Sequence, residues 1–342
     1  MRKGENFAKD VLLSEPKSSH RVIIPLYIPE EEGYYKDAFT IFTYCLISVR
    51  KTSFTNIKVS VISNGCCNSV NTKLFQLQEE NLIDELIIEK ENIGKINSIL
   101  KALRTAEERL ITITDADVLF DNDWEKEVLE VFKAFPKAGS VSPVPVFRTH
   151  FRLTYNIWFD NLFSSRLKFR PVKDPESMTM FANSIGWPWL DIKYKDVIAT
   201  LKSKNNKTAV LGSSHFVCTY KREVFTKMPQ NNSRYKLGGD SEYLYTDFPV
   251  LKMGGYRLAT YGNYAFHLGN VLEDWMDEKH GKLKEEIKES NKNFQLKVLT
   301  PRPVYCFFTE KIFKKVLRSP LVFNYILKQK GLSKKQLNNF TK

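Results

Sequence analysis

The stretch LITITDADVLF, residues 110–120, decides the fold. Its first half is rich in β-branched residues, which pack well on a pleated surface and lose rotamer freedom in a helix. Two carboxylates, Asp115 and Asp117, follow where the predicted strand stops, and an amphipathic helix is predicted behind them. Ligands of open parallel sheets bind just beyond the carboxyl ends of the strands. We therefore expect chemistry at this acidic turn.

The chain upstream alternates predicted strands with amphipathic helices. Strands are expected at residues 21–28, 57–62 and 85–89, and each is followed by apolar residues at helical spacing. This order predicts an α/β fold with a mainly parallel sheet, right-handed crossovers and flanking helices. The carboxyl ends of four strands then meet at one edge, which would carry Tyr27, Ser63, Asn64, Asn92, Gly94, Lys95, Asp115 and Asp117.

Gly94 and Lys95 open a predicted helix at this edge of the sheet. Glycine permits a close backbone approach, and the free N–H groups of a helix start favour an anion. The cationic side chain of Lys95 adds to this preference. Together the two residues predict a diphosphate near the helix start.

The pattern becomes less regular beyond residue 140. SVSPVPVF, residues 140–147, is predicted as an edge strand because of its prolines, and residues 151–189 as an irregular, aromatic-rich segment. A strand is expected at 210–219, then the acidic stretch GGDSEYLYTDF and a strand-like run that ends at His267. We divide the chain into an N-terminal extension (1–20), two halves of one domain (21–140 and 141–270) and a helical, basic C-terminal extension (271–342).

Composition limits the partners and the compartment. The chain has 52 Lys and Arg against 39 Asp and Glu, and the net charge of +13 favours a nucleotide, a nucleic acid or an acidic membrane surface. Five cysteines lack metal or disulfide spacing, the N-terminus is polar, and no stretch approaches the ~18 apolar residues of a membrane span. We expect a cytoplasmic protein, with residues 300–342 either on the inner face of an anionic membrane or packed on the protein's own surface.

Two carboxylates at i and i+2 after a buried strand suit Mg2+ or Mn2+, which take hard oxygen ligands and leave positions for substrate phosphates. An isolated pair of this kind is more often an ordinary turn, because Asp is common in turns. The convergence of strand ends and the Gly94–Lys95 helix start favour a phosphate-bearing ligand here. His267 on its own fits a hydrogen-bonded core histidine as well as a ligand, and His215 is predicted to be structural or a pocket wall.

The chain resembles the family 2 glycosyltransferases from about residue 21 to residue 270. The resemblance rests on RVIIPLY, ENIGKINSILKAL, ITITDADVLF, GGDSEYLYTDFPVLKMGGYRLA and HLGN, which match that family's motifs in order and spacing. It implies a GT-A fold, with a nucleotide-sugar-binding half at residues 21–140 and an acceptor-binding, catalytic half at 141–270. It also implies an inverting, metal-dependent hexosyl transfer from a nucleotide-diphosphate sugar, UDP-linked by expectation. The acceptor would be a glycan or glycolipid of the cell surface.

The resemblance also implies a role for each matching residue. Asp117 would hold Mn2+ or Mg2+ directly, with Asp115 at the metal shell or the donor ribose, and His267 would be a third metal ligand. Asp240 would be the general base that takes a proton from the acceptor hydroxyl. Contacts along the donor would come from Tyr27, Asn64, Asn92, Gly94, Lys95, Asp115 and Ala116.

Two departures and two rival functions bear on this reading. SNGCCN, residues 63–68, lacks the Asp that often reads the nucleotide base, so the base is not identified. Gly239 stands where the family usually has a Glu, which leaves Asp240 as the first choice of base and Glu242 as the second. A nucleotidyltransferase would show a Gly-rich basic loop after the first strand, where this chain has PLYIPEEEG. A nucleic-acid-binding protein would need neither Asp240 nor metal; we expect no nucleic acid as partner.

Overall fold

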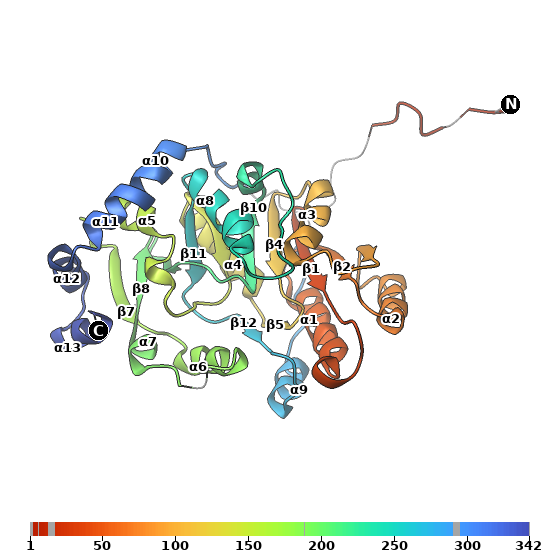
Figure 1. Ribbon diagram of the computed structural model, residues 1–342, viewed down its shortest axis with the longest axis horizontal. Coiled ribbons are helices and arrows are strands. Elements are labelled where there is room, and N and C mark those ends of the chain that lie inside the picture. The colour runs from red at the N-terminus through yellow and green to blue at the C-terminus, as the bar shows by residue number, and fades with distance from the viewer. Residues whose placement is uncertain (1–2, 6, 13–17, 188, 290–294, 342) are drawn as a thin grey trace.

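The computed structural model describes residues 3–5, 7–12, 18–187, 189–289 and 295–341. These residues form a ten-stranded mixed sheet with helices on both faces (Figure 1), which confirms the predicted α/β fold class. Its strand order is β3-β2-β1-β4-β10-β6-β11-β9-β8-β7. The first four of these strands run parallel, as the alternating pattern predicts: β1 (His20–Leu26), β2 (Lys58–Asn64), β3 (Glu85–Glu89) and β4 (Leu110–Thr114).

Helices cover the parallel strands on both faces because consecutive residues of a strand such as β1 are apolar and therefore point to both faces. Val22 and Ile24 of β1 pack in one core cluster with α1 (Ala38–Thr52), α2 (Asn68–Glu79) and α4 (Trp124–Ala134). Ile23, between them, packs in a second cluster with α3 (Lys95–Thr105). A strand with apolar side chains on both faces is typical of a covered parallel sheet.

The second half of the sheet is mostly antiparallel. β10 (Val217–Lys221) runs antiparallel between β4 and β6 (Ala138–Ser142), and β11 (Tyr256–Thr260) runs parallel to β6. The antiparallel strands β9 (Thr208–Leu211), β8 (Val197–Lys202) and β7 (Leu167–Pro171) complete it. The predicted edge strand at 140–147 is therefore wrong. β6 lies inside the sheet, and Pro143 and Pro145 follow it, where they remove no ladder hydrogen bond.

A small two-stranded sheet joins β5 (Val118–Phe120) to β12 (Ala265–His267). Its register sets His267 opposite Val118, and the N–H of Leu268 donates to the carbonyl of Asp117. This pairing brings the predicted histidine beside the acidic turn, across 150 residues of sequence.

The aromatic segment after β6 is more regular than expected. It contains the short helices η2 (Thr149–Phe151), α5 (Tyr155–Asp160), α6 (Pro175–Ser184) and α7 (Ile192–Asp196), besides β7. Phe151 stacks on Trp158 with a ring-centroid distance of 4.9 Å, and Trp158 is fully buried. Several of these rings are thus core packing.

A helix follows the GGD turn at residues 238–240. It includes the π-helical turn η4 (Tyr243–Asp247) and continues as α8 (Phe248–Lys252), with η3 (Arg222–Lys227) packed nearby. Pro249 lies in α8 without ending it. Such π-turns occur frequently at functional sites.

The C-terminal extension contacts both halves of the domain (Figure 1): residues 274–289 pack against α1, whereas residues 303–341 lie against the second half. It consists of α9 (Asp274–Gly281), α10 (Pro303–Phe307), the π-helical turn η5 (Phe308–Phe313), α11 (Lys314–Leu317), α12 (Pro320–Gln329) and α13 (Lys334–Thr341). Leu317 and Leu327 are buried, and the Lys330 ammonium donates to the carbonyls of Asn161 and Ser164. In the part of the chain that the structure describes, no helix combines the length and hydropathy of a membrane span. All five cysteines are free thiols.

Candidate active site

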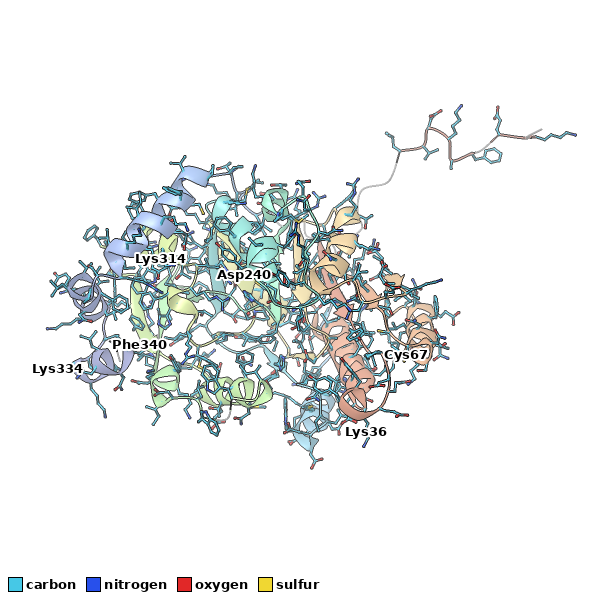
Figure 2. All side chains as sticks on the ribbon, viewed as in Figure 1. Lys36, Cys67, Asp240, Lys314, Lys334 and Phe340 are labelled. Atoms are coloured by element: carbon cyan, nitrogen blue, oxygen red, sulfur yellow. The ribbon has the colours of Figure 1, made fainter. Side chains whose placement is uncertain are left out.

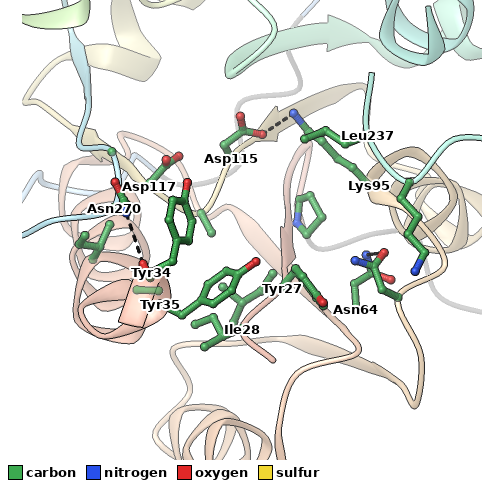
Figure 3. A pocket seen from close by; sticks show the side chains of 18 residues that line it. Tyr27, Ile28, Tyr34, Tyr35, Asn64, Lys95, Asp115, Asp117, Leu237 and Asn270 are labelled. Atoms are coloured by element: carbon green, nitrogen blue, oxygen red, sulfur yellow. Dashed lines mark hydrogen bonds and ion pairs between the residues drawn. The ribbon is translucent and has the colours of Figure 1, made fainter. Parts of the chain in front are cut away.

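A cavity of about 440 Å3 opens at the carboxyl ends of β1, β2 and β4, as the parallel strand order requires. The sequence-predicted residues Tyr27, Asn64, Asn92, Lys95, Asp115, Ala116 and Asp117 all line it. Figure 3 shows their side chains around one opening. We call this opening the nucleotide cavity. Residues that the sequence did not single out complete the lining, among them Ile28, Tyr34, Tyr35, Leu237 and Asn270.

Three tyrosines form one wall of the nucleotide cavity (Figure 3). Tyr35 meets the ring of Tyr27 edge-on at 5.9 Å and that of Tyr34 at 5.1 Å. Tyr34 and Tyr35 belong to the short helix η1 (Gly33–Tyr35), and Tyr34 is 67% exposed. Exposed ring faces can stack on a nucleobase, and such stacking tolerates any base. The sequence singles out Tyr27 at this wall but neither Tyr34 nor Tyr35.

Asn64 and Asn92 hold the floor of the cavity through their amide side chains. Asn64 donates to Asn92 Oδ1 at 3.1 Å, and the N–H of Ile93 donates to Asn64 Oδ1 at 2.9 Å. The N–H of Gly94 donates to Asn92 Oδ1 at 2.9 Å. These bonds fix the backbone that leads into α3.

Three N–H groups at the start of α3, those of Ile93, Gly94 and Lys95, already have acceptors within the chain. The N–H of Lys95 donates to the carbonyl of Lys236 at 2.9 Å, besides the asparagine bonds described above. A Cβ at Gly94, whose φ is +94°, would lie 2.8 Å from the carbonyl of Tyr235. The close approach that Gly94 allows is thus made by the chain's own loop at 235–237. Gly94 does not line the cavity, so the diphosphate expected at this helix start does not lie against Gly94 itself.

A chain of charges runs from the nucleotide cavity into the protein. The Lys95 ammonium lies 2.5 Å from Asp115 Oδ1 and 2.9 Å from Glu242 Oε1. His215 faces Glu242 at 3.3 Å and Asp247 at 2.5 Å, and Asp247 pairs with Arg257 at 2.8 Å. The six side chains alternate in sign, and Asp247 and Arg257 are fully buried.

The network fixes the protonation of its members. Hydrogen bonding from His215 lowers the pKa of Glu242 to about 2; burial opposes this shift and Lys95 adds to it. Burial opposes protonation of His215, but Asp247 and Glu242 outweigh it and raise the His215 pKa to about 9. Burial likewise opposes the charge of Lys95, yet Asp115 and Glu242 raise its pKa. At neutral pH Glu242 is therefore a fixed anion between two cations, which makes it a poor proton acceptor.

This network predicts a pH window of stability. Glu242 contributes above its ordinary pKa of 4.5 and loses its contribution as pH falls toward 2; His215 contributes below its ordinary 6.5 and loses it as pH rises through 9. Chemical unfolding of the wild-type protein should show a loss on the order of 2–3 kcal/mol between pH 6.5 and pH 9. The His215→Gln variant should lack that loss. A wild-type stability that stays constant across this range would contradict the assigned charge states.

Asp117, which lines the nucleotide cavity, and His267 beside it are the residues most suited to a metal ion. His267 Nε2 lies 3.4 Å from Asp117 Oδ2, while its Nδ1 lies 3.0 Å from the Ser184 hydroxyl. Asp117 Oδ1 is buried and has no hydrogen-bond partner, and burial raises the pKa of this carboxyl. A carboxylate oxygen and an imidazole nitrogen are donors that Mn2+ accepts. The two residues therefore fit a divalent cation.

Asp115, the third predicted metal residue, faces Lys95 instead (Figure 3). Within residues 18–187, 189–289 and the other described segments, no three His, Cys, Asp or Glu side chains are already gathered for a metal ion. Of the three expected metal ligands, Asp117 and His267 thus face each other, whereas the Asp115 carboxylate is paired with Lys95.

Asp240 lies outside the nucleotide cavity, in an exposed turn before the helix that starts at Ser241. Gly238, Gly239 and Asp240 all have positive φ, and a Cβ at Gly239 would lie 2.4 Å from the ring of Tyr235. The Glu that the family usually has at this position would not fit. The turn directs Asp240 into a separate cavity that contains Arg148.

An intermediate cavity of about 390 Å3 links the two regions. It shares Asp115 with the nucleotide cavity and Arg148 and Arg152 with the cavity of Asp240. His215 and His267 also line it, so the predicted pocket-wall position of His215 has a counterpart in the structure. The nucleotide cavity, which contains Asp117, and the cavity of Asp240 therefore both adjoin the intermediate cavity. We call these three cavities together the connected system.

Residues 38–187 match the model of the Glycosyl transferase family 2. A poly-beta-1,6-N-acetyl-D-glucosamine synthase of Staphylococcus aureus is 26% identical over 104 residues, which are 30% of this chain and 25% of that protein. The chain thus covers about a quarter of the length of this curated relative.

Two solved structures are similar to this chain at low identity. A mannosyltransferase, PcManGT of Pyrobaculum calidifontis in complex with GDP-Man and Mn2+, has a TM-score of 0.44 and 15% identity, over 96% of this chain and 79% of that one. TarS of Staphylococcus aureus has a TM-score of 0.41 and 11% identity, over 72% of this chain and 60% of that one.

Proposed function

The chain belongs to the family 2 glycosyltransferases, and from this premise we propose that it moves a sugar from a nucleotide-diphosphate donor to a hydroxyl of a glycan or glycolipid. The observation that carries the proposal is the nucleotide cavity, where three tyrosines line the same opening as Asp117 and Lys95. The aromatic rings suit a base, and the metal-binding and cationic residues suit a diphosphate. UDP-linked sugars are the donors that we expect, and the product would belong to a cell-surface polysaccharide or glycolipid.

Asp117 and His267 are the residues that we propose to hold a divalent cation, Mn2+ or Mg2+, which neutralises charge on the departing diphosphate. The unpartnered oxygen of Asp117 supports this assignment because a buried carboxylate oxygen needs a partner. Asp115 orients Lys95, which stays cationic and lies between the cavity and Glu242.

Asp240 is the base in this proposal. It takes the proton of the acceptor hydroxyl while that oxygen bonds to the anomeric carbon and the bond to the diphosphate breaks. Attack from the side opposite the leaving group inverts the anomeric centre. The exposure of Asp240 supports this role, since an acceptor must reach it, whereas Glu242 is held by Lys95 and His215.

Turnover of donor without an added acceptor tests this function. UDP-N-acetylglucosamine, UDP-glucose and GDP-mannose would be incubated with the protein and Mn2+, and nucleoside diphosphate release would be measured. We expect slow release from one donor, with water as acceptor and the first sugar product in the inverted configuration by NMR. Retention of configuration, or no release from any donor with or without metal, would contradict the proposal.

We also propose that the C-terminal extension touches the membrane that carries a lipid acceptor. Val304, Phe307, Ile312 and Val316 are 48–81% exposed beside Lys311, although the opposite face of the same segment is buried against the protein. Apolar and cationic residues on one face suit an anionic lipid surface. The Val304→Ser/Phe307→Ser variant should sediment severalfold less with phosphatidylglycerol vesicles. Equal sedimentation of variant and wild type would exclude this face as the contact.

A further inference from the structure

A cavity of about 460 Å3 beside Asp240 is lined by four cationic side chains. Two come from the loop after β6 and two from the C-terminal extension, and they are Arg148, Arg152, Lys314 and Arg318. We call this opening the basic cavity. Phe151, Leu153 and Tyr243 complete its lining. Figure 2 labels two of the residues that line the basic cavity, Asp240 and Lys314.

Aromatic and hydroxyl contacts fix three of these cations. Arg318 Nε donates to the Tyr155 hydroxyl at 2.5 Å, and the Lys314 ammonium lies 5.4 Å from the centre of the same ring. The Arg148 guanidinium lies 4.4 Å from the ring centre of Trp187. These contacts hold the charges in place without neutralising them.

The cations keep a net positive field in the cavity. Among the described residues, none of the four lies within 4.0 Å of a carboxylate oxygen as an ion pair. Glu310 is near Lys314, but burial raises its pKa to about 7 even though Lys314 lowers it, so this carboxyl is only partly charged at neutral pH. Asp240 is the one carboxylate in the described lining. Four positive charges thus face a single negative charge.

The basic cavity lies on the acceptor side of the connected system. Arg148 and Arg152 also line the intermediate cavity, which reaches Asp115 at the nucleotide cavity. A molecule in the basic cavity would meet Asp240 first, with the donor beyond it. The donor diphosphate already has a place near Asp117, so these cations serve a different group.

We propose that the basic cavity binds a phosphate group of the acceptor, close to the hydroxyl that Asp240 deprotonates. The cavity's position as an acceptor site rests on the proposed function; its preference for phosphate does not. Arginine forks match phosphate oxygens in pairs, and three of the four cations are arginines. A neutral glycan would instead need several uncharged hydrogen-bonding side chains, of which the described lining has Tyr243 alone. The phosphate could belong to a phosphorylated glycan or to a phospholipid-linked sugar.

Calorimetric titration with glucose 1-phosphate, in the absence of metal and nucleotide, tests this proposal. The wild-type protein should bind the probe, and Lys314→Gln/Arg318→Gln should bind at least tenfold more weakly. The control Lys334→Gln/Lys335→Gln removes two exposed charges of the same extension outside the cavity and should leave the affinity unchanged. Arg152→Gln, on a different segment, should also weaken binding and guards against a folding defect at Tyr155.

Phosphatidylcholine vesicles containing phosphatidic acid provide the second arm. Binding of glucose 1-phosphate that depends on the cavity cations supports a phosphorylated glycan as the source. Vesicle binding that depends on the same cations, without binding of the soluble probe, supports a lipid phosphate. Equal loss in the control, or no cation-dependent binding in either arm, would overturn the proposal. Failure of all nucleotides to bind would instead overturn the proposed transferase function and leave the phosphate site intact.

Discussion

Replacing Asp117 with asparagine is expected to lower kcat for sugar transfer by about 10³-fold, because the change removes the charged oxygen that a divalent cation needs. Such a loss corresponds to about 4 kcal/mol of transition-state stabilisation. The fold should survive the change, since Asp117 Oδ1 makes no hydrogen bond and burial opposes its charge. Steady-state kinetics at saturating Mn2+, with a thermal melt for each variant, measures both effects.

Asp123→Asn is the matched control for this substitution. Asp123 lies six residues further on, exposed at the start of α4, with a φ of +64° that asparagine tolerates. It should keep wild-type turnover. If Asp117→Asn also kept its turnover and its response to Mn2+, the metal assignment would be wrong.

Replacing Asp240 with asparagine is expected to lower kcat by about 10²–10⁴-fold while nucleotide binding stays unchanged, because only the proton acceptor is lost. Asparagine suits this position because it accepts the positive φ of +60° found there, whereas alanine would strain the turn. The measurement is kcat for transfer alongside the affinity for the nucleotide.

Glu242→Gln separates the two candidate bases. Glu242 is bound by Lys95 and His215, so its loss should weaken the charge network and cost less activity than the loss of Asp240. A profile in which Glu242→Gln abolished transfer and Asp240→Asn did not would reverse the assignment. It would also imply that the network opens when the acceptor binds.

The sequence predicted the parts of the site that follow strand ends. Runs of β-branched and apolar residues located β1, β2 and β4, and parallel pairing then brought Asn64, Lys95 and Asp117 to one cavity. The resemblance placed His267 near the aspartates, and the β5–β12 pairing does so in the structure. The strand ends depend on local pattern and short connections, which a sequence displays, whereas His267 lies 150 residues from Asp117 and was predicted from the resemblance alone.

Features that depend on long-range packing escaped prediction. Two of the three wall tyrosines, Tyr34 and Tyr35, belong to a three-residue helix whose spacing carries no signal. The loop that covers Gly94 comes from about 140 residues further on. The pairing of Lys95 with Glu242 also joins separate segments. The prediction of an edge strand was wrong because Pro143 and Pro145 stand after β6 rather than in it. The basic cavity could not be predicted, because it forms where the C-terminal extension folds against the loop after β6.

Calorimetric titration of UDP, with GDP and CDP for comparison, tests the central claim that the nucleotide cavity takes a nucleotide together with a metal ion. Each nucleotide would be titrated into the wild-type protein with and without Mn2+. The account predicts binding of at least one nucleotide that requires Mn2+ and disappears in Asp117→Asn. Absence of binding for all three, with or without Mn2+, would contradict it.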